Sequence, residues 1–211
     1  MNNKTKEMII VFSPLILGII EFFHPVGSSN QTPFQAIAPQ VNLWITIHVL
    51  QIPLFGLMAL SLILMTQNLR GRAVTISKIG VGFFIIFYPV IDSIAGIAGG
   101  LLIQNAAKLS PSAQAFMSKQ INVLFFDPIV GGSTFSLFAV LGTLGWLVAV
   151  LGAAWALLKA SVSRVAVIFL FLAAIFFGLS HVPPTGPLGL GCFFIAVMII
   201  DFPVLDKKLN Q

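Results

Sequence analysis

Six long runs of apolar residues divide this chain and constrain its fold more than any other feature. They lie at about 7–24, 41–66, 79–104, 132–158, 164–181 and 187–204. A helix of about 20 apolar residues is long enough to cross the roughly 30 Å hydrocarbon core of a bilayer. Only 8% of the 211 residues are charged, whereas soluble domains carry about 25%. The sequence therefore predicts an all-α fold, a polytopic transmembrane helical bundle of six helices that forms one membrane domain over residues 1–211.

The positive charges between these runs predict how the chain is oriented. Nine basic residues lie on one side of the predicted membrane: Lys4, Lys6, Arg70, Arg72, Lys78, Lys159, Arg164, Lys207 and Lys208. Only Lys108 and Lys119 lie on the other side. Loops rich in lysine and arginine remain in the cytoplasm. We therefore expect a multi-pass protein of the plasma (inner) membrane with both termini in the cytoplasm.

Charge and cysteine content exclude several classes of function. The net charge of +5 comes from basic residues scattered through the turns, and no basic helix indicates nucleic-acid binding. We expect membrane lipid as a partner, a small-molecule or lipid ligand as a further candidate, and no nucleic acid. Cys192 is the only cysteine, so no disulfide forms within the chain. We expect the first run to be retained, because Pro14 and Glu21 interrupt it and no A-x-A cleavage site follows.

The segment 105–131 is the one long connection, and its pattern predicts an amphipathic helix. Ser110 and Pro111 suit an N-cap and a first helical position. Apolar residues then recur at helical spacing, namely Phe116, Met117, Ile121, Leu124 and Phe125. Such a helix is expected to lie flat on the outer leaflet of the membrane.

Rare ionisable residues from four of the runs converge on the outer half of the predicted bundle. They are Glu21, His24, His48, Asp92 and His181, and they include every histidine of the chain. Trp44 and Gln51 share a stripe with His48, and Tyr88 lies one turn before Asp92. A charged group at the bilayer centre costs about 2.5–3.5 kcal/mol on insertion scales, so these side chains are expected to face the bundle interior. Pro183 and Gly186 are expected to shape the rim of this pocket.

Three functions could use this outward-facing pocket, and the residues alone leave all three open. The leading interpretation is a non-catalytic one, in which the polar cluster stabilises the bundle and the protein binds lipid or a partner. The first alternative is a membrane-embedded hydrolase that depends on a divalent metal, Zn or Fe, with Glu21, His24, His48, Asp92 and His181 as ligands. In that case Glu21, Asp92 and Tyr88 would be the catalytic candidates that handle protons. The second alternative is a proton-coupled transporter of a small solute, with Asp92 and Glu21 as the titrating pair.

Overall fold

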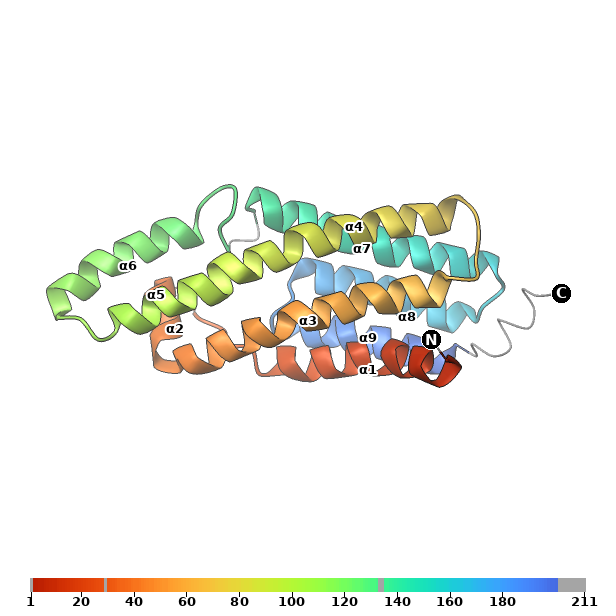
Figure 1. Cartoon of the computed structure of the whole chain (residues 1–211), viewed down its shortest axis with the longest axis horizontal. Coiled ribbons are helices and arrows are strands. Elements are labelled where there is room, and N and C mark those ends of the chain that lie inside the picture. Colours follow the sequence, from red (N-terminus) through yellow and green to blue (C-terminus); the bar gives the residue numbers. More distant parts are fainter. Residues whose placement is uncertain (1, 29, 133–134, 201–211) are drawn as a thin grey trace.

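The computed structural model of the chain describes residues 2–28, 30–132 and 135–200, and every regular element in these ranges is helical. The longer helices run side by side along one axis (Figure 1). They are α1 (Asn3–Phe22), α3 (Val41–Thr66), α4 (Arg72–Ile91), α7 (Leu137–Lys159), α8 (Arg164–Leu179) and α9 (Thr185–Ile199). The shorter elements are α2 (Pro33–Ile37), the 3₁₀ helix η1 (Ala38–Gln40), the π-helix η2 (Asp92–Ala98), α5 (Gly99–Ala106) and α6 (Pro111–Phe125). The predicted all-α fold is confirmed.

Three helical segments are long and apolar enough to cross a membrane. They are Pro33–Thr66, Arg72–Ala106 and Leu137–Lys159. Two shorter apolar helices, Arg164–Leu179 and Thr185–Ile199, accompany them. The 20-residue helix α1 carries Lys4, Lys6 and Glu7 in its first turns and Glu21 near its end. The described part of the chain is therefore all-helical and has three candidate membrane-spanning helices, as expected for a membrane protein.

The observed helices follow the predicted runs closely, with differences at their ends. Helix α3 has the predicted bounds, 41–66. Helix α1 begins earlier than the apolar run, at Asn3, because the Asn2 side chain accepts a hydrogen bond from the Thr5 N–H at 2.8 Å and caps the helix. Helix α9 ends at Ile199. The predicted continuation over 201–204 lies outside the described residues, as do Lys207 and Lys208.

Two features of the fold were not predicted from the apolar pattern. The chain between α1 and α3 forms α2 and η1, and a capping box of Thr32 and Gln35 starts α2. This T-x-x-Q spacing was a readable signal for a helix start. The second feature is the π-helix η2, which widens the middle of the long 72–106 segment.

Aromatic residues and close backbone contacts hold the bundle together. Its core contains the fully buried side chains of Trp146, Phe55, Phe84, Phe177 and Phe193. Helices α4 and α7 approach most closely where Gly80 and Gly145 face each other's helix: a Cβ at Gly80 would stand 2.8 Å from the Ala149 Cα, and one at Gly145 would stand 2.9 Å from the Phe83 Cβ. Small residues at such positions let two helix backbones touch.

Helix α3 and the 72–106 segment extend beyond the rest of the bundle, and α6 packs against α5, the last helix of the 72–106 segment. At 1.5 Å per residue, α3 is about 39 Å long and the 72–106 segment about 52 Å, both longer than the roughly 30 Å hydrocarbon core. Helix α6 starts at Pro111, directly after Ser110, as predicted, and then runs back beside α5, along the long axis of the molecule (Figure 1). Ile121 and Phe125 bury themselves against Ile103 and Ala106 of α5. The helix itself agrees with the sequence, whereas its position on the outer leaflet stays a prediction.

Candidate metal centre

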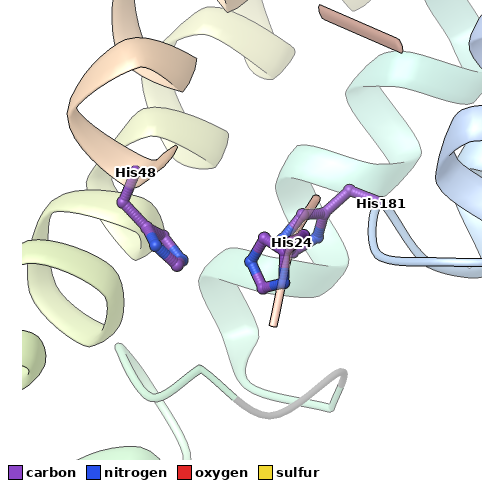
Figure 2. Close-up of side chains that lie close together, drawn as sticks. All are labelled: His24, His48 and His181. Atoms are coloured by element: carbon purple, nitrogen blue, oxygen red, sulfur yellow. The ribbon is translucent and has the colours of Figure 1, made fainter. Parts of the chain in front are cut away.

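The three histidines of the chain, 157 residues apart at the extremes of the sequence, meet in one place. The nearest ligand nitrogens of His24, His48 and His181 all lie within 4.8 Å of one another. The ring of His24 stands between the other two, with centroid distances of 5.0 Å to His48 and 5.2 Å to His181. Figure 2 shows His48 reaching from α3 toward the ring of His24, with His181 behind it. His24 and His48 are buried and His181 is half-buried.

Two of these histidines follow the ends of helices, and the third lies within a helix. His24 follows the end of α1, where its backbone N–H donates to the Glu21 carbonyl oxygen at 3.1 Å. His181 follows the end of α8. His48 lies on α3, four residues after Trp44, so its ring can reach back to the preceding turn. Three separate segments therefore supply one imidazole each.

Backbone carbonyls set the tautomer of two of the rings. Nδ1 of His24 lies 2.9 Å from the Pro25 carbonyl oxygen, and Nδ1 of His48 lies 2.7 Å from the Trp44 carbonyl oxygen. A carbonyl oxygen can only accept a hydrogen bond, so each Nδ1 carries the hydrogen and each Nε2 keeps its lone pair. Histidines that bind metals are oriented in this way by their second nitrogen.

The remaining ring nitrogens include two that no protein group satisfies. Among the described residues, Nε2 of His24 and Nε2 of His181 are buried side-chain atoms with no hydrogen-bond partner. Buried polar atoms in folded proteins are nearly always paired with protein, water or an ion. Two unpaired ring nitrogens beside a third imidazole fit a shared metal ion.

The π-helix η2 packs against the His48 side chain. Gly96 of η2 lies directly against the His48 ring, and a Cβ added at Gly96 would stand 2.8 Å from the His48 Cβ and nearer still to ring atoms. The Gly96 carbonyl oxygen accepts a hydrogen bond from the Trp44 indole N–H at 2.8 Å. The Trp44 ring in turn lies 4.3 Å from the His48 ring, centroid to centroid. His48 is thus enclosed by η2 and by Trp44.

The first residues of α9 pack against the backbone of His181. Gly186 is buried against the His181 backbone, and a Cβ at this position would overlap the His181 carbonyl group. Its N–H donates to the Val182 carbonyl oxygen at 3.0 Å. Neither Gly186 nor the half-buried Pro183 lines either of the two cavities described below, so their role at the rim of a pocket stays a prediction.

Glu21 and Asp92, predicted as metal ligands, do not belong to the histidine group. Glu21 is fully buried and accepts a hydrogen bond at 2.7 Å from the amide of Gln51, which is also fully buried. This bond joins α1 to α3. The second carboxyl oxygen of Glu21 and one carboxyl oxygen of Asp92 have no hydrogen-bond partner among the described residues.

Asp92 and Tyr88 lie beside the histidines in a cavity of about 210 Å³, here called the His181-side cavity. Thr143, Ser180 and His181 also line it. The Tyr88 ring stands edge-on to the His181 ring, with 5.7 Å between centroids. A second cavity of about 250 Å³, the His24-side cavity, is lined by residues that include His24, Trp44, Ile37, Phe125 and Phe126. The histidine group lies between the two cavities.

Three imidazoles with free nitrogens are a recognised ligand set for a divalent metal. Zinc binds imidazole nitrogen at about 2.0–2.1 Å, and tetrahedral geometry then places two such nitrogens about 3.3 Å apart. For three atoms separated by 4.8 Å at most, each nitrogen must move inward by about 0.9 Å or less to reach that geometry. Side-chain rotations suffice for such a shift. A three-histidine zinc site leaves its fourth position open for a water molecule or a substrate.

Gly96 lies against a histidine of this site but was not among the predicted site residues. The signal was present in its spacing, because Gly96 lies one turn after Asp92 on the segment predicted to face the polar pocket. What the spacing could not indicate was that η2 would bring this glycine against His48. Comparisons with protein-family models, curated proteins and solved structures give no match for this chain, so the interpretation of the site depends on its geometry.

Proposed function

We propose that this protein is a membrane-embedded, metal-dependent hydrolase whose metal centre is formed by His24, His48 and His181. The observation that carries the proposal is the convergence of three imidazoles, two of them hydrogen-bonded through Nδ1 to backbone carbonyls so that Nε2 keeps its lone pair. Zinc is the metal that best fits three neutral imidazoles without a carboxylate ligand. The non-haem iron arrangement requires two histidines and one carboxylate.

We propose six membrane-crossing helices with both termini in the cytoplasm and the metal centre near the outer surface. In support, the N-terminus and the α3–α4 and α7–α8 connections lie at one end of the molecule, and α6 lies at the other (Figure 1). Basic residues Arg70 and Lys159 are at the first end, and Lys108 is at the second. In a Cys192→Ala background, a cysteine placed at Ser112 should react with an impermeant maleimide added to intact cells, and one at Ser161 should not.

Hydrolysis is favoured over simple metal binding by what surrounds the histidines. A bound metal ion would supply Lewis acidity and a water molecule of lowered pKa. In hydrolysis of an ester, the water oxygen adds to the carbonyl carbon and the bond to the alcohol oxygen breaks, giving an acid and an alcohol. In this proposal Asp92 accepts a proton from water and passes it to the departing alcohol oxygen, and the cavity that Asp92 and His181 both line supports this role. Tyr88 lines that cavity as a hydrogen-bond donor for the substrate.

A structural metal centre without catalysis is the second candidate. The hydrogen bond between Glu21 and Gln51 favours it, because this fully buried pair links α1 to α3 without facing either cavity. A metal bound by His24, His48 and His181 would tie together the same two helices and the end of α8. This candidate predicts bound metal with no hydrolytic activity.

Elemental analysis of detergent-purified protein tests the metal centre directly. After incubation with zinc and removal of excess metal, we expect about one zinc ion per chain. His24→Ala, His48→Ala and His181→Ala should each lose most of it, whereas Cys192→Ala, which removes the only thiol, should retain it. Wild-type protein without zinc would overturn the proposal. With zinc bound, Asp92→Asn should lower the rate of ester hydrolysis at unchanged zinc content. If the zinc-loaded wild-type protein hydrolyses no ester, the hydrolase proposal is wrong and the structural metal centre is the remaining candidate.

A further inference from the structure

The His24-side cavity differs in character from the cavity on the other side of the metal centre. Apolar and aromatic side chains dominate its inner wall, among them Trp44, Ile37 and Phe125. No charged side chain lines it within the described part of the chain. Its polar residues are neutral, such as Gln31 and Gln40. A cavity of this kind favours an uncharged apolar group over a charged one, because burial of an unpaired charge is costly.

The mouth of this cavity is continuous with the apolar outer surface of the bundle. Val26 and Phe126 line the cavity and are 57% and 61% exposed. The adjacent end of α1 exposes Phe22 and Phe23. Exposed aromatic and aliphatic side chains beside a membrane-spanning helix lie at the level of lipid. An acyl chain could therefore enter from the membrane without crossing water.

The inner end of the cavity reaches the metal centre. His24 lines the cavity, is 5% exposed and has an unpartnered Nε2. At about 250 Å³ the cavity is slightly below the roughly 300 Å³ at which pockets for drug-sized molecules begin. A volume of this size is enough for a short acyl chain.

We infer that the His24-side cavity is an acyl-chain subsite, so that the substrate class is an acyl ester of a membrane amphiphile. This inference rests on the proposed hydrolase function. The carbonyl group of the ester lies at the three histidines, the acyl chain fills the apolar cavity, and the alcohol portion faces Asp92 in the His181-side cavity. Each methylene group transferred from water into such a cavity favours binding by about fourfold.

The test compares two substrates, p-nitrophenyl acetate and p-nitrophenyl octanoate, with zinc-loaded full-length protein in detergent. We expect kcat/KM to be at least about tenfold higher for the octanoate. Ala36→Phe, which fills the cavity from α2, should reduce this ratio to about one. Val26→Trp at the mouth is a second variant that does not depend on repacking of α2. Ala115→Phe on the exposed face of α6 is the matched control and should keep the wild-type ratio.

The outcomes separate this inference from the proposed function. Hydrolysis of both esters at equal rates by the wild-type protein would establish a hydrolase and overturn the acyl subsite. A wild-type ratio in both Ala36→Phe and Val26→Trp would overturn the location of the subsite. Zinc-loaded protein that cleaves neither ester would overturn the hydrolase function and the subsite with it. Zinc content and thermal unfolding of each variant verify that it is folded.

Discussion

Substitution of Gly96 by alanine tests whether the π-helix η2 positions a metal ligand. A Cβ at this position would stand 2.8 Å from the His48 Cβ, whereas carbon atoms prefer separations of about 3.5–4.0 Å. The His48 side chain must therefore move by at least about 0.7 Å, and its ring atoms lie closer still to the added methyl group. The added methyl group lies against the ring itself, so it also blocks the rotation by which the His48 nitrogen would approach a metal ion.

We expect Gly96→Ala to weaken zinc binding by about 10–100-fold, the loss typical when a group that orients a ligand is disturbed. The loss corresponds to about 1.4–2.8 kcal/mol of binding free energy. Overpacking should also lower the free energy of unfolding by about 1–3 kcal/mol. Competition of the purified protein with a chromophoric zinc chelator measures the first quantity, and thermal unfolding in detergent measures the second.

Gly82→Ala is the matched control for this experiment. Gly82 lies on α4, in the same long helical segment, and a Cβ there meets no atom within 4 Å. Alanine at Gly82 should leave zinc affinity unchanged and add up to about 1 kcal/mol of helix stability. If Gly96→Ala binds zinc as tightly as Gly82→Ala and the wild-type protein, the contact between η2 and His48 does not position the ligand, and the reasoning is refuted.

Three further substitutions address other parts of the structure. Gly186→Ala should displace the His181 backbone and reduce zinc content, measured by elemental analysis, and unchanged zinc content would contradict the packing described here. Gln51→Met should lower the free energy of unfolding by about 1–3 kcal/mol, because it leaves the buried Glu21 carboxyl group without its hydrogen-bond partner. The double variant Glu21→Met/Gln51→Met removes both polar groups and should unfold at a temperature close to that of the wild-type protein. Hydrogen bonds from the backbone N–H groups of Val130 and Ile129 lower the pKa of Asp127. The ionised Asp127 carboxylate therefore stabilises the folded protein above the unfolded-state pKa of about 3.9. This stabilisation is lost as the pH falls through the lower pKa of the folded state. Asp127→Asn should therefore remove this part of the acid sensitivity, and an unchanged pH profile of unfolding would exclude the effect.

Apolar run length was sufficient to predict the longer helices from the sequence, but not α2, η1 or the π-helix η2. The bounds of α3 match the run 41–66, and α7 and α8 differ from their runs by a few residues, because a helix in lipid must satisfy its own backbone hydrogen bonds. The choice of site residues was also accessible, since ionisable groups are costly in apolar segments and must find one another. His24, His48 and His181 were chosen on that reasoning, and they lie together.

Only the tertiary structure decided which of the five predicted ligands share one space. Sequence spacing places Glu21 and His24 on one face of a helix, but the helix ends before His24, and Glu21 turns to Gln51 while His24 turns to the other histidines. The π-helix and the contact of Gly96 with His48 depend on how two helices approach each other. Such contacts join residues distant in sequence, and no local pattern encodes their separation. The polar residues could therefore be chosen from the sequence. Helix packing decided that three imidazoles gather around one point and that the two carboxyl groups lie beside them.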